Sequence, residues 1–186
     1  MSLLSFCEWL AGTPWSIALH ESQYMYSFVE STHVLTLCLF LGTLIFMDLR
    51  MLGVTLRSVP VGEVAARVLP WTVAGFVIMV ITGALLFYAI PVRSYQSIFF
   101  RIKVLLLILA GLNAWHYHRH AHRTVAAWGG DPRPPKSVRV SAMVSLCAWT
   151  GVIFAGRFIA YNWFDCDRQP QPAFINWAAG CVVEPE

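Results

Sequence analysis

Four histidines occupy every second position of one short stretch, HYHRHAHR, which follows a long apolar run. On a helix, His116 and His120 share one face, and His118 and His122 share another, because side chains four residues apart are neighbours. A histidine pair at this spacing can bind Zn²⁺ or Cu²⁺, although a pair alone does not complete a site. Arg119, between the histidines, and Arg123, directly after them, repel a cation. The stretch is therefore a belt at the end of an apolar helix, a metal site, or, through His116, part of a haem site.

A second set of ionisable residues interrupts the apolar segments themselves. Glu30 and His33 share one helical face of the first segment, Lys103 lies early in the third, and Arg157 lies near the end of the fourth. At about 1.5 Å per residue, all four lie roughly 3 to 8 Å below the same face of a membrane. Ionisable groups inside a membrane predict a functional site, here one that holds a quinone headgroup or haem propionates. The alternative is an ion pair of Glu30 with Arg157 or Lys103 that only fixes helix register.

A b-type haem with two histidine ligands needs both imidazoles at one depth on different helices. His33 and His116 differ in depth by roughly 19 Å, so they cannot bind one iron, and the second and fourth segments contain no histidine. Three weaker arrangements stay open. One haem could be held by His33 with His20 or another ligand, a second could use His116, and a partner subunit could supply a missing ligand.

These residues are carried by an unusually apolar chain. Of its 186 residues, 58% are hydrophobic and 12% are charged, and the mean hydropathy is +0.61, whereas a soluble domain has about 25% charged residues. Four apolar segments have the length of about 20 residues that crosses a bilayer, and inside lipid such segments must be helical. We predict an all-α, integral membrane four-helix bundle with spans at 24–47, 71–90, 98–117 and 138–161. An N-terminal segment, 1–23, contains a short interfacial helix or a surface loop at 3–11, and a C-terminal tail covers 162–186.

The basic residues predict how the spans are oriented. Three Lys or Arg residues lie in the first connection and five in the third, whereas the second connection and the tail have one each. Because cytoplasmic loops are rich in Lys and Arg, we expect the first and third connections in the cytoplasm and both termini in the periplasm of a bacterial inner membrane. The beginning of the chain lacks the basic and apolar regions of a signal peptide. The net charge of +3 gives no indication of nucleic-acid binding.

The five cysteines differ in their predicted surroundings. Cys166 and Cys181 lie in the tail, where an oxidising compartment would allow a disulfide, and the spacing leaves a bonded and an unbonded pair equally open. Cys38 and Cys147 lie within spans, as inert core residues do, and Cys7 has no predicted partner.

Several stretches resemble a family of small, uncharacterised, four-helix bacterial inner-membrane proteins. They are ESTHVLTLCLFLGTLIFMDLRMLGV, WTVAGFVIMVITGALLFYAIP, LNAWH and GRFIAY, and they lie between residues 15 and 162. The matching motif positions are His33, Gly42, Asp48, Leu49, Arg50, Pro70, Trp71, Gly83, Lys103, Asn113 and Arg157. The resemblance implies a fold and a membrane but no reaction, and the likeness to b-type cytochromes is architectural only.

Together these observations predict an integral membrane subunit of a periplasm-facing redox or electron-transfer system. It would bind the lipid bilayer and partner subunits or a periplasmic redox protein, and would hold one b-type haem or a quinone. One alternative is a protein that handles or transports copper, based on the histidine run and the methionines of the spans. Another is a structural anchor without a cofactor. We expect no independent catalytic activity, since no serine-triad order, phosphate-binding glycine loop or HExxH motif is found.

Overall fold

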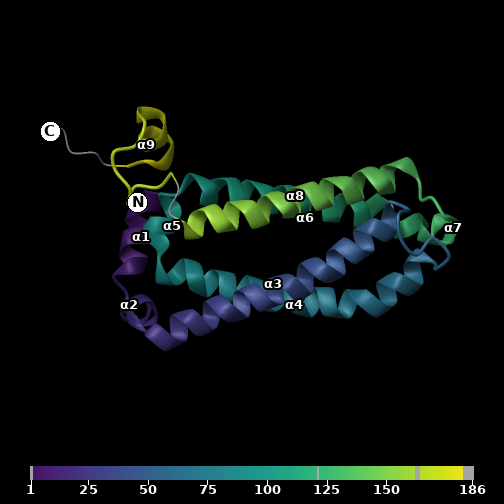
Figure 1. Ribbon diagram of the computed structural model, residues 1–186, viewed down its shortest axis with the longest axis horizontal. Coiled ribbons are helices and arrows are strands. Elements are labelled where there is room, and N and C mark those ends of the chain that lie inside the picture. The colour runs from purple at the N-terminus through teal and green to yellow at the C-terminus, as the bar shows by residue number, and fades with distance from the viewer. Residues whose placement is uncertain (1, 121, 162–163, 182–186) are drawn as a thin grey trace. The chain divides into compact units, whose positions relative to one another are not determined.

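The computed structural model describes residues 2–120, 122–161 and 164–181, and all regular secondary structure in them is helical (Figure 1). Four helices are long and apolar enough to cross a membrane: α3 (Gln23–Met51), α4 (Val61–Ala89), α6 (Ile98–His120) and α8 (Lys136–Ala160). The shorter elements are α1 (Leu3–Ala11), α2 (Pro14–Glu21), α5 (Pro91–Tyr95), the 3-10 helix η1 (His122–Thr124), α7 (Val125–Trp128) and α9 (Ala173–Ala179). The predicted all-helical architecture with four candidate membrane spans is confirmed.

The largest difference from the predicted spans concerns α4, which begins at Val61 rather than Trp71. Pro70 lies inside this helix, where we expected a boundary. Neighbouring helices can satisfy the backbone groups that a proline frees in such a helix. The apolar length therefore indicated the part of α4 suited to a membrane, and the helix itself extends further.

Local sequence signals account for most of the other helix ends. Ser2 caps α1, because its side chain accepts a hydrogen bond from the backbone N–H of Ser5 at 3.1 Å. Prolines occupy the first turn of α2 and α5, where the missing N–H costs nothing. Gly180 ends α9 with φ of 72°, a left-handed conformation that favours glycine.

The chain divides into two compact units, and each long helix contributes residues to both. Unit 1 consists of Met1–His33, Val80–Leu105 and Val152–Glu186. Unit 2 consists of Val34–Met79 and Leu106–Gly151.

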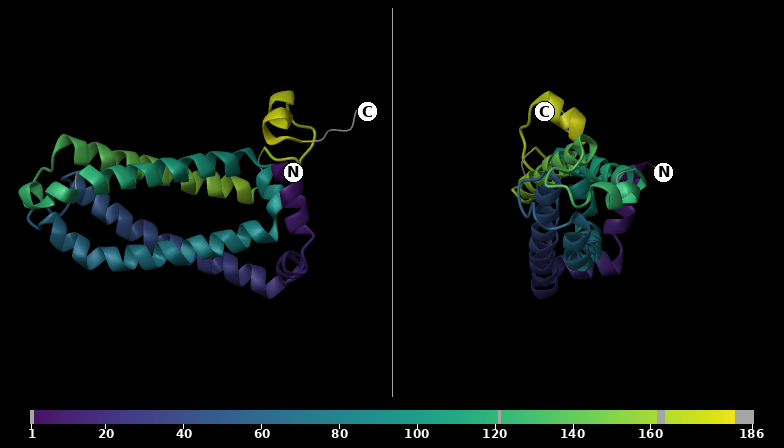
Figure 2. Two further views of the ribbon diagram at one scale, coloured as in Figure 1. Left: turned by 180° about the vertical axis from the view of Figure 1, so that it is seen from behind. Right: turned by 90° about the vertical axis from the view of Figure 1, so that its right-hand side faces the viewer.

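In unit 1, the short N-terminal helices are joined to the end of α4. Helix α1 packs against α5, as Figure 2 shows from the opposite side. The hydroxyl groups of Thr13 and Tyr88 lie 2.7 Å apart, and the hydroxyl of Ser16 donates to the backbone carbonyl of Tyr88 at 2.7 Å. The predicted helix at 3–11 is therefore present, and the turn after it is held in place by side-chain hydrogen bonds.

In unit 2, Phe40 joins three of the long helices. Its side chain is buried, and its ring lies 5.5 Å from that of Phe76 on α4 and 4.7 Å from that of Trp149 on α8. Gly75 allows this approach, because a Cβ there would lie 3.2 Å from the backbone nitrogen of Phe40. Small residues that let helix backbones come close are typical of membrane helices.

Residues at helical spacing on α8 and on α4 form two stripes, and such stripes are typical of packing surfaces between membrane helices. Ser141, Ser145, Ala148 and Val152 are all buried. The corresponding positions Met79 and Thr82 of α4 are buried too. The packing interpretation of both stripes is thus confirmed.

Candidate functional site

His33 is the best-ordered candidate ligand in unit 1. Its Nδ1 lies 2.9 Å from Oγ1 of Thr82 on α4, and the tautomer of the ring decides which atom donates. The ring also lies against Gly83, where a Cβ would be 3.2 Å from Cε1. One residue therefore orients the imidazole and the next leaves space for it. This is how a protein commonly fixes a histidine that binds a ligand through its other nitrogen.

Lys103 contributes a cation to the same unit from α6. Its side chain is partly buried, and its Nζ lies 3.9 Å from the position that a Cβ on Gly156 of α8 would occupy. A glycine thus leaves space beside the ammonium group, just as Gly83 leaves space beside the imidazole of His33. Two polar groups in unit 1 are each adjacent to a residue without a side chain.

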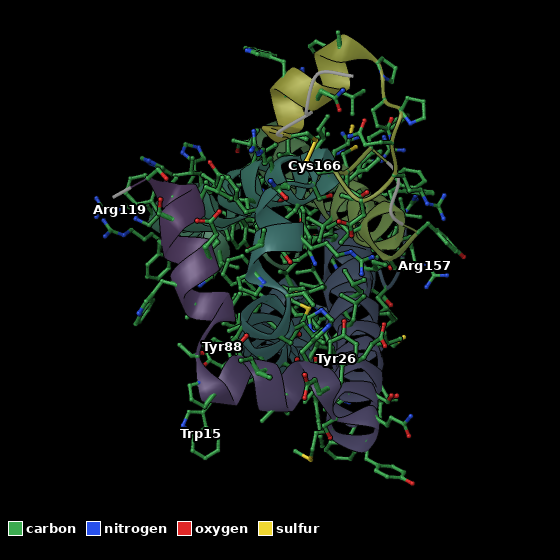
Figure 3. The ribbon with its side chains drawn as sticks, turned by 90° about the vertical axis from the view of Figure 1, so that its left-hand side faces the viewer. Trp15, Tyr26, Tyr88, Arg119, Arg157 and Cys166 are labelled. Carbon is green, nitrogen blue, oxygen red and sulfur yellow. A yellow bond between two sulfur atoms is a disulfide. The ribbon has the colours of Figure 1, made fainter. Side chains whose placement is uncertain are left out.

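Arg157 and Glu30 belong to the same unit as His33, but their side chains are not buried within it. Both are exposed. Arg157 donates from Nη2 to the hydroxyl of Tyr161 at 2.7 Å and lies over its ring at 5.0 Å, and Figure 3 shows its side chain turned outward. Among the described residues the ion pairs are Arg67–Glu63 and Arg93–Asp167, so neither predicted pair of Glu30 is formed.

His20 lies in the last turn of α2 and is exposed. In the described part of the chain it has no hydrogen bond or ring contact, with His33 or with any other residue. The structure therefore does not assemble a pair of histidines around one iron in unit 1.

The HYHRHAHR stretch covers the last turn of α6 and the start of η1. The rings of His116 and His120 lie 4.6 Å apart, and both are exposed. His118 contacts Tyr117, with ring centroids 5.9 Å apart. The side chain of His122 lies outside the described residues. Among the described residues, no three His, Cys, Asp or Glu side chains gather around a possible metal position.

The tail is closed by a disulfide between Cys166 and Cys181, and the bond is visible in Figure 3. Arg101, at the start of α6, donates to the carbonyl oxygens of Ala178 and Ala179 at the end of α9. These contacts hold α9 on the same unit as α1.

Asp165, which precedes the first disulfide cysteine, is buried. Burial, followed by the charge of Asp167, raises its pKa above the usual aspartate value, although Arg93 and Arg168 oppose the shift. The tail thus contains a carboxyl group that folding disfavours in its ionised form.

Sequence reasoning missed a second polar cluster, in unit 2. Asp48 and Arg50, both near the end of α3, are 1% and 0% exposed. Arg50 donates to the carbonyl oxygens of Val59 at 2.8 Å, Gly129 at 3.5 Å and Asp131 at 3.2 Å. The hydroxyl group of Ser145 on α8 lies near Asp48, and Oδ2 of Asp48 is buried without a hydrogen-bond partner. The available signal was the place of Asp48 on the buried stripe of α3, four residues after Leu44.

Comparisons with curated proteins and with solved structures gave no match. A family model does match residues 11–162, which cover all four long helices and leave out α9. The matched range thus includes the residues of both polar clusters, the one around His33 and the one around Asp48. The chain accordingly belongs to DUF6644, a family of unknown function.

Proposed function

We propose that the protein is an integral membrane subunit of a periplasm-facing electron-transfer system and that it binds a quinone headgroup at His33. The observation that carries the proposal is the imidazole of His33, held by Thr82 at 2.9 Å and accommodated by Gly83 inside an apolar helix pair. Polar groups in membrane helices are costly and usually functional.

The surroundings of His33 fit a quinone better than a haem. If Thr82 donates to Nδ1, the proton of the neutral ring lies on Nε2, which can then donate to a quinone carbonyl oxygen. Lys103, in the same unit, is a second possible donor. A haem would need a second axial ligand, and His20 is exposed. When bound, the quinone would supply the redox chemistry, and the protein would supply the orienting donors.

The tail supports the periplasmic orientation. A disulfide between Cys166 and Cys181 suits an oxidising compartment. The excess of Lys and Arg in the first and third connections favours the same orientation. A bacterial inner membrane, periplasmic termini and a partner that docks beside the tail are all parts of this proposal.

Quinone binding can be tested with purified protein in lipid nanodiscs by titrating a short-chain quinone analogue and following tryptophan fluorescence. We expect saturable binding that weakens at least about tenfold, or about 1.4 kcal/mol, in His33→Ala. His116→Ala is the matched control and should keep the wild-type affinity.

An absorption spectrum of the native membrane complex separates the two cofactors. A Soret band that disappears in His33→Ala would mean that the residue binds haem instead. Absence of both quinone binding and a Soret band would refute the redox proposal and leave the structural anchor. Copper handling has weaker support, because only the exposed pair His116 and His120 comes together.

A further inference from the structure

Asp48 is a buried carboxyl group in unit 2, whereas the residues used in the proposed function belong to unit 1. It is 1% exposed and lies on α3. The hydroxyl group of Ser145 on α8 lies near the carboxyl group. The atom Oδ2 is buried without a hydrogen-bond partner. A carboxylate has about four lone-pair positions to satisfy, so this environment supplies far fewer donors than the ionised form requires.

Among the described residues, no ion pair joins Asp48 to a basic side chain of a neighbouring helix. Tyr117 on α6 lies close enough for the charge of Asp48 to act on its hydroxyl. On α4, Glu63 and Arg67 pair with each other at 2.7 Å, and both are exposed. On α8, Lys136 is exposed.

The remaining charged groups near this end of the helices are also directed elsewhere. Arg50 follows Asp48 on the same helix, and its Nε and Nη2 donate to three backbone carbonyl oxygens, among them that of Val59. Its Nη1 is buried without a hydrogen-bond partner, but among the described residues it forms no ion pair with Asp48. Arg139 on α8 is exposed. Among the described residues no ion pair includes Asp48. An ionised carboxylate here would be a buried, unpaired charge, which is very costly, and groups in this situation usually become neutral.

We infer that Asp48 is an intramembrane proton-binding site, and that its carboxyl group holds a proton in the folded protein at neutral pH. The inference is independent of the proposed function, because it uses neither His33 nor a quinone. The added proton removes the charge that no ion pair among the described residues balances, and it turns one carboxyl oxygen into a hydrogen-bond donor.

A metal cation fits the same position less well. Hard cations take about six oxygen ligands, and among the described residues no three His, Cys, Asp or Glu side chains gather around a possible metal position. Another polar pair, Ser141 on α8 and Asn113 on α6, is hydrogen-bonded to itself. The hydroxyl of Ser141 donates to Oδ1 of Asn113 at 3.0 Å, and the amide of Asn113 donates to the backbone carbonyl of Ser141 at 2.9 Å. The proton is therefore the ligand that this cluster can accommodate.

Infrared spectroscopy of the full-length protein in nanodiscs tests the inference. A carboxylic-acid C=O band at neutral pH that shifts when only aspartate is isotope-labelled belongs to a protonated aspartic acid. The chain has four aspartates, of which Asp131 and Asp167 are exposed and Asp165 is buried. The measurement is therefore made in Asp165→Asn protein, so that Asp48 is the one buried aspartate left.

We expect a label-sensitive band in Asp165→Asn that disappears in the double variant with Asp48→Asn. Asparagine keeps the size of the side chain and an acceptor for Ser145. Absence of the band in Asp165→Asn, or its persistence in the double variant, overturns the inference. If the double variant does not fold, the Asp165→Asn spectrum alone decides.

The same sample separates a proton from a sodium ion. Replacing choline by Na⁺ as the cation of the buffer should leave the infrared band unchanged. Its loss on addition of Na⁺ would show that a metal cation replaces the proton, and would overturn the assignment.

Discussion

His33 and Asp48 each have a hydroxyl group of a neighbouring helix beside them, Thr82 in the first case and Ser145 in the second. A hydroxyl can donate or accept and carries no charge. It therefore orients an imidazole or a carboxyl group without neutralising it, as a salt bridge would.

Gly83 provides the sharpest test of packing at His33. In Gly83→Ala the new methyl group would lie 3.2 Å from Cε1 of His33, so the ring must shift. We expect a loss of stability of about 1–3 kcal/mol and weaker quinone binding, measured by thermal unfolding and by the fluorescence titration.

Gly42→Ala is the matched control, since a Cβ there meets nothing within 4 Å. It should be neutral or slightly stabilising, because alanine favours a helix by about 1 kcal/mol over glycine. Equal effects of the two substitutions would contradict the packing argument.

Asp165 predicts how the stability of the tail depends on pH. Folding raises its pKa, so its contribution is most favourable below the unfolded value of about 3.9 and is lost as the pH rises through the higher folded value. Limited proteolysis of the tail should therefore become faster over that pH range. Asp165→Asn should remove this component, and an unchanged pH profile in this variant would contradict the assignment.

At the scale of elements, the buried face of α3 was largely predictable from helical spacing. Leu41 and Asp48 lie on it as expected. Glu30 was placed on the same face but is exposed. Periodicity gives a direction around a helix only to within a broad arc, so it does not decide the orientation of a long side chain near a helix end.

Arg50 connects α3 to two irregular segments, through the carbonyl groups of Val59, Gly129 and Asp131. Lysine lacks the planar, forked donors of arginine. Arg50→Lys should therefore destabilise the protein by about 2–4 kcal/mol, since the hydrogen bonds of a charged group are worth about 1.5–3 kcal/mol each and only some would be replaced. Thermal unfolding measures this change.

The control for Arg50 is Arg67→Lys, which alters an exposed pair within one helix. Such pairs contribute about 0.3–0.5 kcal/mol, so the unfolding temperature should hardly change. If Arg50→Lys is equally mild, the buried guanidinium is not what holds the two segments.

For the whole molecule, the sequence was sufficient to predict an all-helical chain with four candidate spans, because apolar length is a strong and local signal. The cluster around Asp48 was not predicted as a site. It depends on which faces of α3, α6 and α8 meet, and each helix alone shows only one polar residue among many apolar ones. The histidine run misled for the opposite reason. Its regular spacing is obvious, yet among its described side chains only His116 and His120 come together, and they do not form a group of three metal ligands.

Membrane orientation is the main property of the whole molecule that can be measured directly. An alkaline phosphatase fused after Glu186 should be active, because the enzyme folds only in the periplasm. A fusion within 129–135, in the third connection, should be inactive. The reverse pattern would contradict the proposed orientation.

The disulfide in the tail also means that the number of free thiols in a molecule depends on the compartment that its tail reached. The chain has five cysteines, and Cys7, Cys38 and Cys147 are free. Under denaturing conditions without reductant, a molecule whose tail reached an oxidising compartment would react with alkylating reagents at three thiols. A molecule whose tail stayed in the reducing cytoplasm would react at five. Counting reactive thiols by mass would therefore give the fraction of molecules inserted in each orientation, without any fusion or label.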